Sequence, residues 1–277
     1  MNRNIGYVNR DSPIHRLNPA VKLFSLVSVL VATIILSRWY ITFLLLVGVI
    51  IAFKIGRVPL NLAADRTRFL ITFSVLILVV QLIAVQNGMV IFYLFPTVEG
   101  IGPFFPVTTF GLQRGLTFSL RFMLIIFSSM LFVAVTDPTL LAYSLTDLGI
   151  PYRYSFALVI ALRFVPFFDM EMDSVRMAQR SRGVSPQIGR PSKLLRTIRM
   201  TFYPLLVSAF SKANSLTMSM DGRGFGYNTT RTYIRKSTWK KTDWVVLMFS
   251  IAFLIASLLL VLCFSHIFKL AYEYGFY

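Results

Sequence analysis

The sequence predicts an all-α integral membrane protein of about five transmembrane helices with a helical cytoplasmic domain. Hydrophobic residues make up 56% of the 277 residues and charged residues only 14%, so the chain holds more apolar surface than a soluble domain buries. The apolar residues form long blocks, and a polar, basic segment separates the last two blocks. The expected organisation is a membrane part at 1–135, a cytoplasmic domain at 136–243, and a last transmembrane helix with the C-terminus at 244–277.

Five apolar blocks are expected to cross the membrane. The first two, 23–37 and 39–53, are separated only by Arg38, and one helix through both would measure about 46 Å. Because a hydrocarbon core is about 30 Å thick, two short helices joined as a hairpin are favoured. Polar residues through Asn18 and the lack of a cleavage signature predict that the first block is kept and not removed as a signal peptide. The remaining blocks are 69–85, 116–135 and 244–264.

The distribution of basic residues predicts the orientation. Most of the 28 Lys and Arg residues fall in the N-terminal segment, in the connection after the second block, and at 136–243. The loop at 86–113 contains Glu99 and neither Lys nor Arg. The positive-inside rule therefore places the N-terminus in the cytoplasm and, with five spans, the C-terminus outside.

The net charge of +17 is also typical of nucleic-acid-binding proteins. Here the excess lies in loops beside the apolar blocks, and the sequence contains no recognition module that combines aromatic and basic residues. Membrane topology and anionic lipid explain the charge, so we expect the lipid bilayer as a partner and no nucleic acid.

The residues that support most enzyme chemistry are scarce in this sequence. One cysteine, Cys263, and two histidines, His15 and His266, offer no metal cluster and no Ser-His-Asp arrangement, and no G-x-x-x-x-G-K-[ST] phosphate loop occurs. The apolar blocks contain no Asp or Glu, and their one internal charge, Arg121, is expected to snorkel or to pair inside the helix bundle. We expect no catalytic residue, metal or cofactor, an ion-driven carrier is a poor fit, and any ATP hydrolysis belongs to another subunit.

The segment at 136–243 predicts three helices. Asp137 can cap a short amphipathic helix that stops at Gly149. A second helix covers 154–183, is apolar in its first half and charged in its second, and is expected to kink at Pro166. A third covers 191–224, with apolar residues at three- and four-residue spacing. The second and third are therefore long helices.

Both long helices end in an Arg-Gly pair, Arg182 with Gly183 and Arg223 with Gly224. Glycine allows the left-handed conformation after a last turn, and arginine favours the negative end of the helix dipole, so one such pair is an ordinary helix terminus. Two pairs in one segment indicate more, because each guanidinium can form a bidentate contact with a carboxylate of another protein. The two tips are therefore predicted docking points.

Short motifs are spread over nearly the whole chain: SPIHRLNPAVKL at 12–23, TDP at 136–138, LGIP at 148–151, LRFVP at 162–166, Glu171, AQRSRG at 178–183 and MDGRGFG at 220–226. In this order and spacing they resemble the transmembrane T component of energy-coupling factor (ECF) transporters, the EcfT/CbiQ family of ABC-class uptake systems. The resemblance implies a multi-pass protein of the bacterial cell membrane that is not itself an enzyme.

The resemblance also implies partners and a mechanism. In that family, Ala-Arg-Gly tips of two coupling helices sit in grooves of two ATPase subunits; here Ser181 and Gly222 hold the alanine positions. The helices would pass the motion of the ATPases to a separate substrate-binding S component, which releases a vitamin or other micronutrient inward. The residues expected to dock the ATPases are Ala178, Arg182, Gly183, Arg223 and Gly224, and those expected to contact the S component are Phe164, Phe167, Met170, Phe202 and Leu206.

Two other functions remain open at this stage. A permease subunit of a conventional ABC importer pairs with a second permease, lines its own substrate path and usually presents one main coupling helix. A membrane scaffold unrelated to transport has no ATPase partner. Two arginine tips in one chain favour the T component, while the cargo stays open among vitamins such as folate, riboflavin or biotin and metal ions such as cobalt or nickel.

Overall fold

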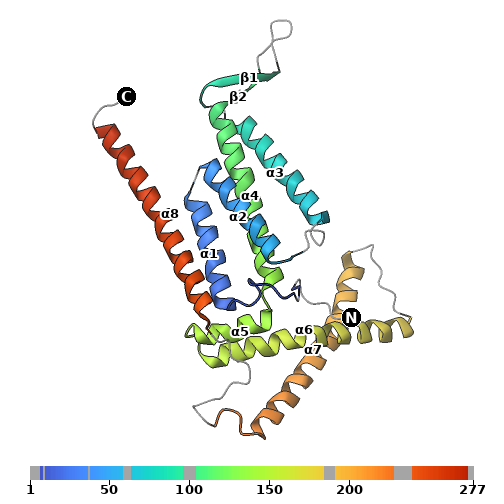
Figure 1. Ribbon diagram of the computed structural model, residues 1–277. Helices are drawn as coiled ribbons and strands as arrows, with labels where there is room; N and C mark the ends of the chain where they lie inside the picture. Colours follow the sequence, from blue (N-terminus) through green and yellow to red (C-terminus); the bar gives the residue numbers. More distant parts are fainter. Residues whose placement is uncertain are drawn as a thin grey trace. The chain divides into compact units, whose positions relative to one another are not determined.

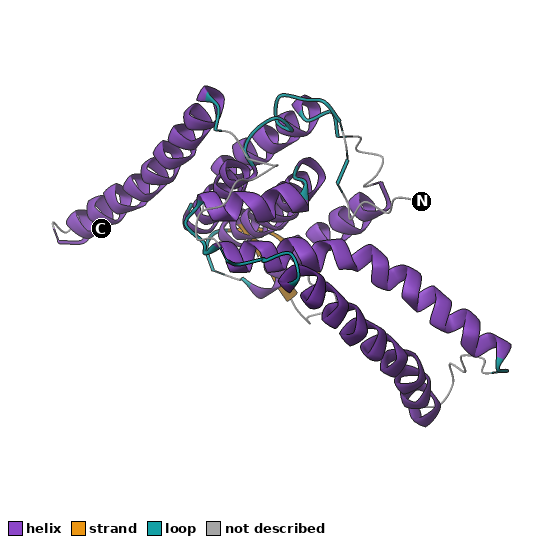
Figure 2. Cartoon of the chain, turned by 90° about the horizontal axis from the view of Figure 1, so that it is seen from below, coloured by secondary structure: helices purple, strands orange, loops and turns teal. Residues whose placement is uncertain are grey.

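The computed structural model describes residues 7–8, 10–36, 38–58, 64–85, 87–95, 104–183, 191–227 and 239–273. The chain divides into two compact units. Unit 1 consists of Met1–Leu141 with Thr238–Tyr277, and unit 2 is Ala142–Ser237. Helices dominate both units, and the described strands form a single hairpin in unit 1 (Figure 2).

The long helices of unit 1 run side by side, with α4 packed against α1, α2 and α3, and α8 packed against α1 (Figure 1). Residues at the N-terminus of a helix determine where it begins, as α1 shows. Asn18 caps α1, because its Oδ1 accepts a 2.9 Å hydrogen bond from the backbone N of Ala20, and Pro19 suits a first turn in which no helical partner is needed. The long helices are α1 (Pro19–Ile35), α2 (Trp39–Ile55), α3 (Ala64–Ala84), α4 (Thr109–Val135) and α8 (Lys241–Glu273).

The apolar lengths of these helices fit a membrane protein. By length and composition, α4 and the Lys241–Cys263 part of α8 can each cross a membrane, whereas Pro19–Ile35, Trp39–Ile55 and Arg68–Ala84 are apolar but shorter. The predicted class, an α-helical membrane protein, fits this architecture, while the number of five transmembrane helices stays a prediction. Ser37, which ends the first predicted block, and Glu99 lie outside the described residues.

The structure corrects the sequence prediction between the third and fourth apolar blocks. The expected loop at 86–113 contains the antiparallel strands β1 (Val90–Phe95) and β2 (Phe104–Thr108), so the chain is not entirely α-helical. Helix α4 begins at Thr109 and not at 116, because Thr108 Oγ1 accepts a hydrogen bond from the backbone N of Gly111 and caps the helix before the apolar block. Helix α8 likewise continues past 264 to its end at residue 273. Apolar content alone marks neither boundary.

A buried core lies between α2 and α4. The Phe53 ring is almost fully buried and meets the Phe127 ring edge to face, with centroids 6.0 Å apart. Leu124 is fully buried in the same cluster. Leu46, Val49, Val58, Ala134 and Val135 complete the buried set.

Helix α3 packs on α4 along a row of small residues spaced four apart. Gly111, Gly115 and Ser119 are all buried. A Cβ at position 111 would lie 2.7 Å from the carbonyl oxygen of Val85, so this close approach requires glycine. Further along, the hydroxyls of Ser119 and Ser74 are hydrogen-bonded. This G-x-x-x-G-x-x-x-S pattern is visible in the sequence, but the sequence analysis did not use it.

A buried polar cluster ties the start of α1 to the start of α8. One carboxylate oxygen of Asp243 accepts a 3.0 Å hydrogen bond from the backbone N of Asn18, and the other accepts one from the backbone N–H three residues before Asp243 (2.8 Å). The Nζ of Lys22 donates to the carbonyl oxygens of His15 and Val135, each at 3.0 Å. These bonds bring the last residue of α4 to the same cluster.

Arg121, the charge inside the fourth apolar block, pairs within unit 1. Its Nη2 donates to the carbonyl oxygens of Ile34 and Leu36 at the end of α1, each at 3.4 Å. Its guanidinium carbon lies 5.4 Å from the ring centroid of Phe118. A cation at this place partners the last carbonyls of α1 and faces the negative end of its dipole. The arginine thus pairs inside the helix bundle.

Unit 2 is built around two long helices, α6 (Tyr152–Ser181) and α7 (Pro191–Asp221). A short helix, α5 (Pro138–Asp147), precedes them and begins in unit 1. The three helices expected in this part of the chain are confirmed, with ends within a few residues of the predicted ones. Pro166 lies inside α6 and Pro204 inside α7, and neither proline ends its helix.

Candidate functional site

The two long helices of unit 2 form an antiparallel pair, and this decides where their ends lie (Figure 1). Their contacts join late positions of α6 to early positions of α7, and earlier positions of α6 to later positions of α7. The end of each helix therefore lies toward the start of the other. The contacts are the hydrogen bonds from Gln179 Nε2 to Met200 O (2.7 Å) and from Ser208 Oγ to Glu171 Oε1 (2.9 Å), and the approach of Lys212 Nζ to 5.2 Å from the Phe167 ring centroid.

Arg182 and Gly183 form the first tip, at the end of α6. Gly183 has a φ of 75°, and its N–H donates to the carbonyl oxygen of Arg180 (3.0 Å). The N–H of Arg182 donates to the carbonyl oxygen of Ala178 (3.2 Å). Glycine ends the helix here as predicted, because it has no Cβ to oppose a positive φ. Ala178, Arg182 and Gly183 are all exposed.

Arg223 and Gly224 form the second tip, after α7. Gly224 has a φ of 67°, and its N–H donates to the carbonyl oxygen of Asp221 (2.9 Å). The N–H of Phe225 donates to the carbonyl oxygen of Met220 (3.0 Å). Together these bonds make a Schellman motif, which satisfies two of the last carbonyls of the helix. In both tips the arginine directly precedes the left-handed glycine.

Aromatic rings anchor the second tip to the start of α6. The Phe225 ring stacks on Phe156, with centroids 4.8 Å apart, and lies 6.4 Å from the ring of Tyr152. Because Phe225 follows Arg223 by two residues, the second tip lies beside the start of α6, whereas the first tip is its end. At ~1.5 Å per helical residue, about 40 Å of α6 separates the two tips. The sequence does not indicate this role of Phe225, since a single aromatic residue after a glycine belongs to no periodic pattern.

Both tips present an available positive charge. Among the residues that the structure describes, the salt bridges are Arg16 with Asp11 and Arg176 with Asp173, and neither tip arginine takes part in one. Arg182 and Arg223 are exposed. An exposed guanidinium can form two parallel hydrogen bonds with a carboxylate, so each tip can bind an acidic group.

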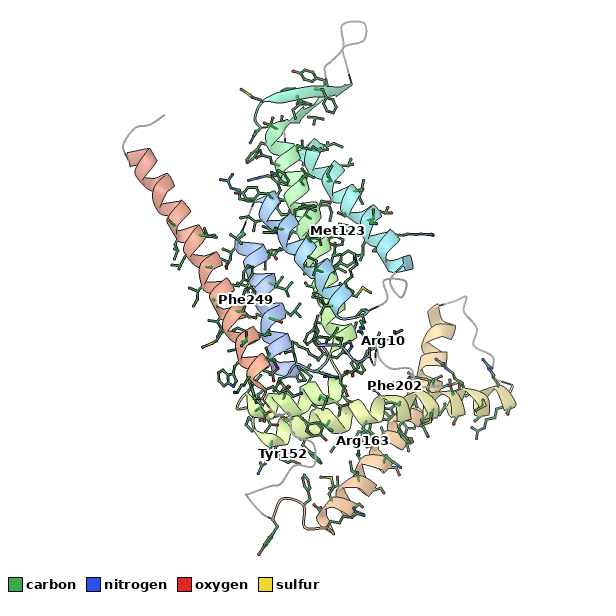
Figure 3. All side chains as sticks on the ribbon, viewed as in Figure 1. Arg10, Met123, Tyr152, Arg163, Phe202 and Phe249 are labelled. Carbon is green, nitrogen blue, oxygen red and sulfur yellow. The ribbon has the colours of Figure 1, made fainter. Side chains whose placement is uncertain are left out.

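The residues predicted to contact the S component do not share one degree of exposure. Met170 and Phe202 are 64% and 59% exposed. Phe202 is labelled in Figure 3. Phe164, Phe167 and Leu206 are only partly exposed. The rings of Phe164 and Phe167 also meet each other edge to face, with centroids 6.2 Å apart. Part of this predicted surface therefore serves the packing of unit 2.

An exposed apolar face of α7 was missed in the sequence. It consists of Tyr203, Val207 and Phe210, which are 68%, 54% and 66% exposed. Their three- and four-residue spacing is the same as that of a buried helix face, so the sequence pattern cannot separate the two. Whether such a face is exposed depends on which side of α7 packs against α6. In the described part of the chain, these three side chains are not covered.

The chain resembles known membrane transport proteins over most of its length. The family model of CbiQ, a cobalt transport protein, matches residues 10–234. The chain belongs to the CbiQ family. Three proteins similar to it are described as the energy-coupling factor transporter transmembrane protein EcfT. The relative from Leuconostoc gelidum subsp. gasicomitatum is 30% identical over 257 residues (90% of this chain and 93% of the relative), that from Bacillus subtilis 30% over 254 (87% and 91%), and that from Lacticaseibacillus paracasei 29% over 247 (86% and 90%).

Membership of the CbiQ family confirms the resemblance drawn from the motifs and makes this chain a membrane transport protein. The matched residues include both arginine tips, all of α6 and α7, and Asn18 and Lys22 of the buried polar cluster, but not Asp243. They end before α8 begins. The family is therefore recognised by the N-terminal helices and the antiparallel helix pair.

Proposed function

We propose that this chain couples ATP hydrolysis on two partner subunits to the release of a substrate from a separate S component. The chain is the transmembrane component of an energy-coupling factor transporter, as the descriptions of its relatives indicate. One observation carries the proposal: two exposed arginine tips lie toward opposite ends of one helix pair in unit 2.

The separation of the tips supports two ATPase partners. About 40 Å of helix lies between Arg182 and Arg223, which is comparable with the width of one globular domain of ordinary size. Each tip has the same arginine before a left-handed glycine, so two similar acidic grooves side by side match this arrangement. Ala178 and the small residues at 181 and 222 leave room for close approach to such grooves.

The helix pair is suited to transmit motion between the partners. An α-helix is stiff along its axis, and hydrogen bonds from Ser208 to Glu171 and from Gln179 to Met200 join α6 to α7. A displacement at either tip is therefore passed to the whole pair. The stacking of Phe225 on Phe156 adds a separate contact between the second tip and the start of α6.

The S component has an apolar surface available on the same helices. Met170 and Phe202, predicted from the sequence, are exposed, and the apolar face of α7 adds Tyr203, Val207 and Phe210. Exposed apolar helix faces bind the membrane-embedded surface of another helical protein by side-chain packing. We place the S-component contact on these five side chains.

The proposal also includes the membrane topology of the chain and the class of cargo. We assign five transmembrane helices, a cytoplasmic N-terminus and an external C-terminus, because most basic residues then lie on the cytoplasmic side. The residues at 136–243 are the cytoplasmic coupling domain. The cargo is a vitamin or another micronutrient, selected by the S component, and the chain itself contributes no catalytic residue. ATP hydrolysis occurs on the partners.

A conventional ABC importer permease is the second candidate and is less well supported. Such a permease pairs with a second permease and presents one main coupling helix, whereas this chain has two arginine-ended helices. The relatives described above are components of energy-coupling factor transporters. Purification of the assembled complex separates the two candidates, because only the importer contains a second permease.

The decisive experiment reverses the charge of both tips. We expect Arg182→Glu combined with Arg223→Glu to abolish substrate uptake in vesicles, while ATP hydrolysis by the partners persists or the partners dissociate, because the carboxylates would face acidic grooves. Uptake and hydrolysis are measured on the same preparation of the reconstituted transporter. The matched control is Arg163→Glu, which makes the same charge change in the middle of α6 (Figure 3).

The control variant should keep the coupling ratio of uptake to hydrolysis. Normal uptake by the double variant, with both ATPases still bound, would show that the tips are ordinary helix ends. Insertion of the chain into the membrane serves as the check on folding.

A further inference from the structure

The β1–β2 hairpin is an exposed apolar structure that the proposed function does not use. Met89, just before its first strand, is 81% exposed, and Val90, Ile91, Phe92 and Tyr93 in the strand are between 44% and 54% exposed. They point to both faces of the strand, because successive side chains alternate. Neither 87–95 nor 104–113 contains a charged residue. Such an edge strand in water would be a site of aggregation, and proteins usually protect it with charges.

The hairpin is held firmly to the ends of α3 and α4. Thr108 Oγ1 donates to the carbonyl oxygen of Val85 (3.1 Å) and accepts from the backbone N of Gly111 (3.0 Å). The N–H of Thr109 donates to the carbonyl oxygen of Met89 (2.9 Å). Strand β2 packs against both helices, and Figure 1 shows the hairpin lying across their ends. Its depth in the membrane is therefore set by α4.

The sequence of α4 indicates what that depth is. From 115 to 135 it is an apolar stretch of about 31 Å, which matches a hydrocarbon core of about 30 Å. The one charge inside this stretch, Arg121, is paired with carbonyl oxygens at the end of α1. Arg114 precedes this stretch, and its guanidinium carbon lies 4.7 Å from the Phe110 ring centroid, one turn toward the hairpin. A charged group at this place marks the edge of the core. Thr108 lies about 9 Å further out along α4, close to the outer limit of a headgroup layer of about 5–8 Å.

We propose that the β1–β2 hairpin lies in the outer headgroup layer of the bilayer and anchors the ends of α3 and α4 there. The occupant of its apolar surface is lipid at the boundary between headgroups and acyl chains. This layer favours aromatic side chains such as Phe92 and Tyr93. It also contains water for the open edge of a two-stranded sheet, which the hydrocarbon core would not tolerate.

Lipid is favoured over a protein partner because exposed apolar side chains are found both on α3 and on the hairpin. On α3, Val79, Val80 and Ile83 are also exposed, so an apolar surface flanks the short turn that contains Asn87 on both sides. The bilayer covers such a surface along its whole length. The inference requires only that α4 crosses the membrane and is independent of the ATPase and S-component assignments.

The test measures the depth of single labels in the full chain. In a Cys263→Ser background, Tyr93→Cys is labelled with an environment-sensitive fluorophore and reconstituted into vesicles of phosphatidylcholine and phosphatidylglycerol. Quenching is compared for lipids with a nitroxide on the headgroup, lipids with a nitroxide deep in the acyl chain, and iodide in the water. Leu76→Cys on α3 is the deep reference, and Met218→Cys on α7 is the aqueous reference, since both side chains are exposed on the protein.

We expect the label at 93 to be quenched several-fold more by the headgroup nitroxide than by iodide or the deep nitroxide. A second label at Met89→Cys should give the same order, which guards against a local distortion at one site. Iodide quenching equal to that of the aqueous reference would overturn the proposal. Protection from iodide that arises only after the other transporter subunits are added would also overturn it, because the occupant would then be protein.

Discussion

At the scale of single residues, Gly224 decides the geometry of the second arginine tip. Its φ is 67°, a conformation that residues with a Cβ rarely adopt. Nothing lies within 4 Å of the position of an added Cβ, so the cost of substitution comes from the backbone alone. We expect Gly224→Val to destabilise the tip by about 1–2 kcal/mol and to weaken ATPase binding. Binding is measured by co-purification of the ATPases. Gly222→Ala is the control, since this position does not have a positive φ and should keep the complex.

His15 provides a second prediction at this scale. Its Nε2 donates to the carbonyl oxygen of Val8 (2.9 Å) and its Nδ1 accepts from Ser12 Oγ (2.7 Å), an arrangement that fits the neutral ring. Burial is the main cause that lowers the pKa of His15 below its usual value, and the charge of Lys22 adds to it. The folded state therefore binds the proton less well than the unfolded state, and stability falls as pH drops below about 6.5.

An NMR titration checks this prediction. In a His266→Gln variant, the imidazole of His15 should titrate below pH 6.5, the approximate value for a free histidine. The thermal midpoint in detergent should decrease between neutral and mildly acidic pH, and this decrease should be smaller in His15→Gln. A titration midpoint at or above the free value would contradict the burial argument.

At the scale of elements, the α3–α4 contact depends on small residues. We expect Gly111→Ala to lower stability by about 1–3 kcal/mol, because the added Cβ would lie 2.7 Å from the carbonyl oxygen of Val85 and the backbones would have to separate. Gly48→Ala on α2 is the matched control, since nothing lies within 4 Å of its added Cβ. The denaturation midpoints of the two variants provide the measurement. Equal midpoints would show that α3 and α4 do not need this close approach.

At the scale of the whole molecule, Asp243 joins segments from opposite ends of the chain. Its carboxylate starts α8 and also accepts the backbone N–H of Asn18, and its side chain is fully buried. We expect Asp243→Ala to lower the free energy of unfolding by about 2 kcal/mol, since two backbone donors lose their acceptor. Asp243→Asn keeps one acceptor oxygen and should lose less. Unfolding midpoints in detergent provide the measurement. An equal decrease in the two variants would contradict the prediction.

Local patterns explain why much of the fold could be predicted. Apolar blocks mark the helices of unit 1, and a glycine after a periodic helix marks each tip, because Gly183 and Gly224 act through their own backbone conformation. Strands β1 and β2 were missed because a short apolar run inside a loop is weak evidence for a strand. The exposed apolar face of α7 was missed because exposure depends on what another helix covers.

The sequence by itself determined the membrane class, the three helices between 138 and 221, the two arginine tips and the family. These features depend on composition, on helical period and on terminators, all of which act within a few residues. Only the tertiary structure decided the partners of Arg121 and Asp243 and the placing of the tips about 40 Å apart along α6. Such features arise from contacts between residues distant in the chain, and a one-dimensional pattern does not specify which of those contacts form.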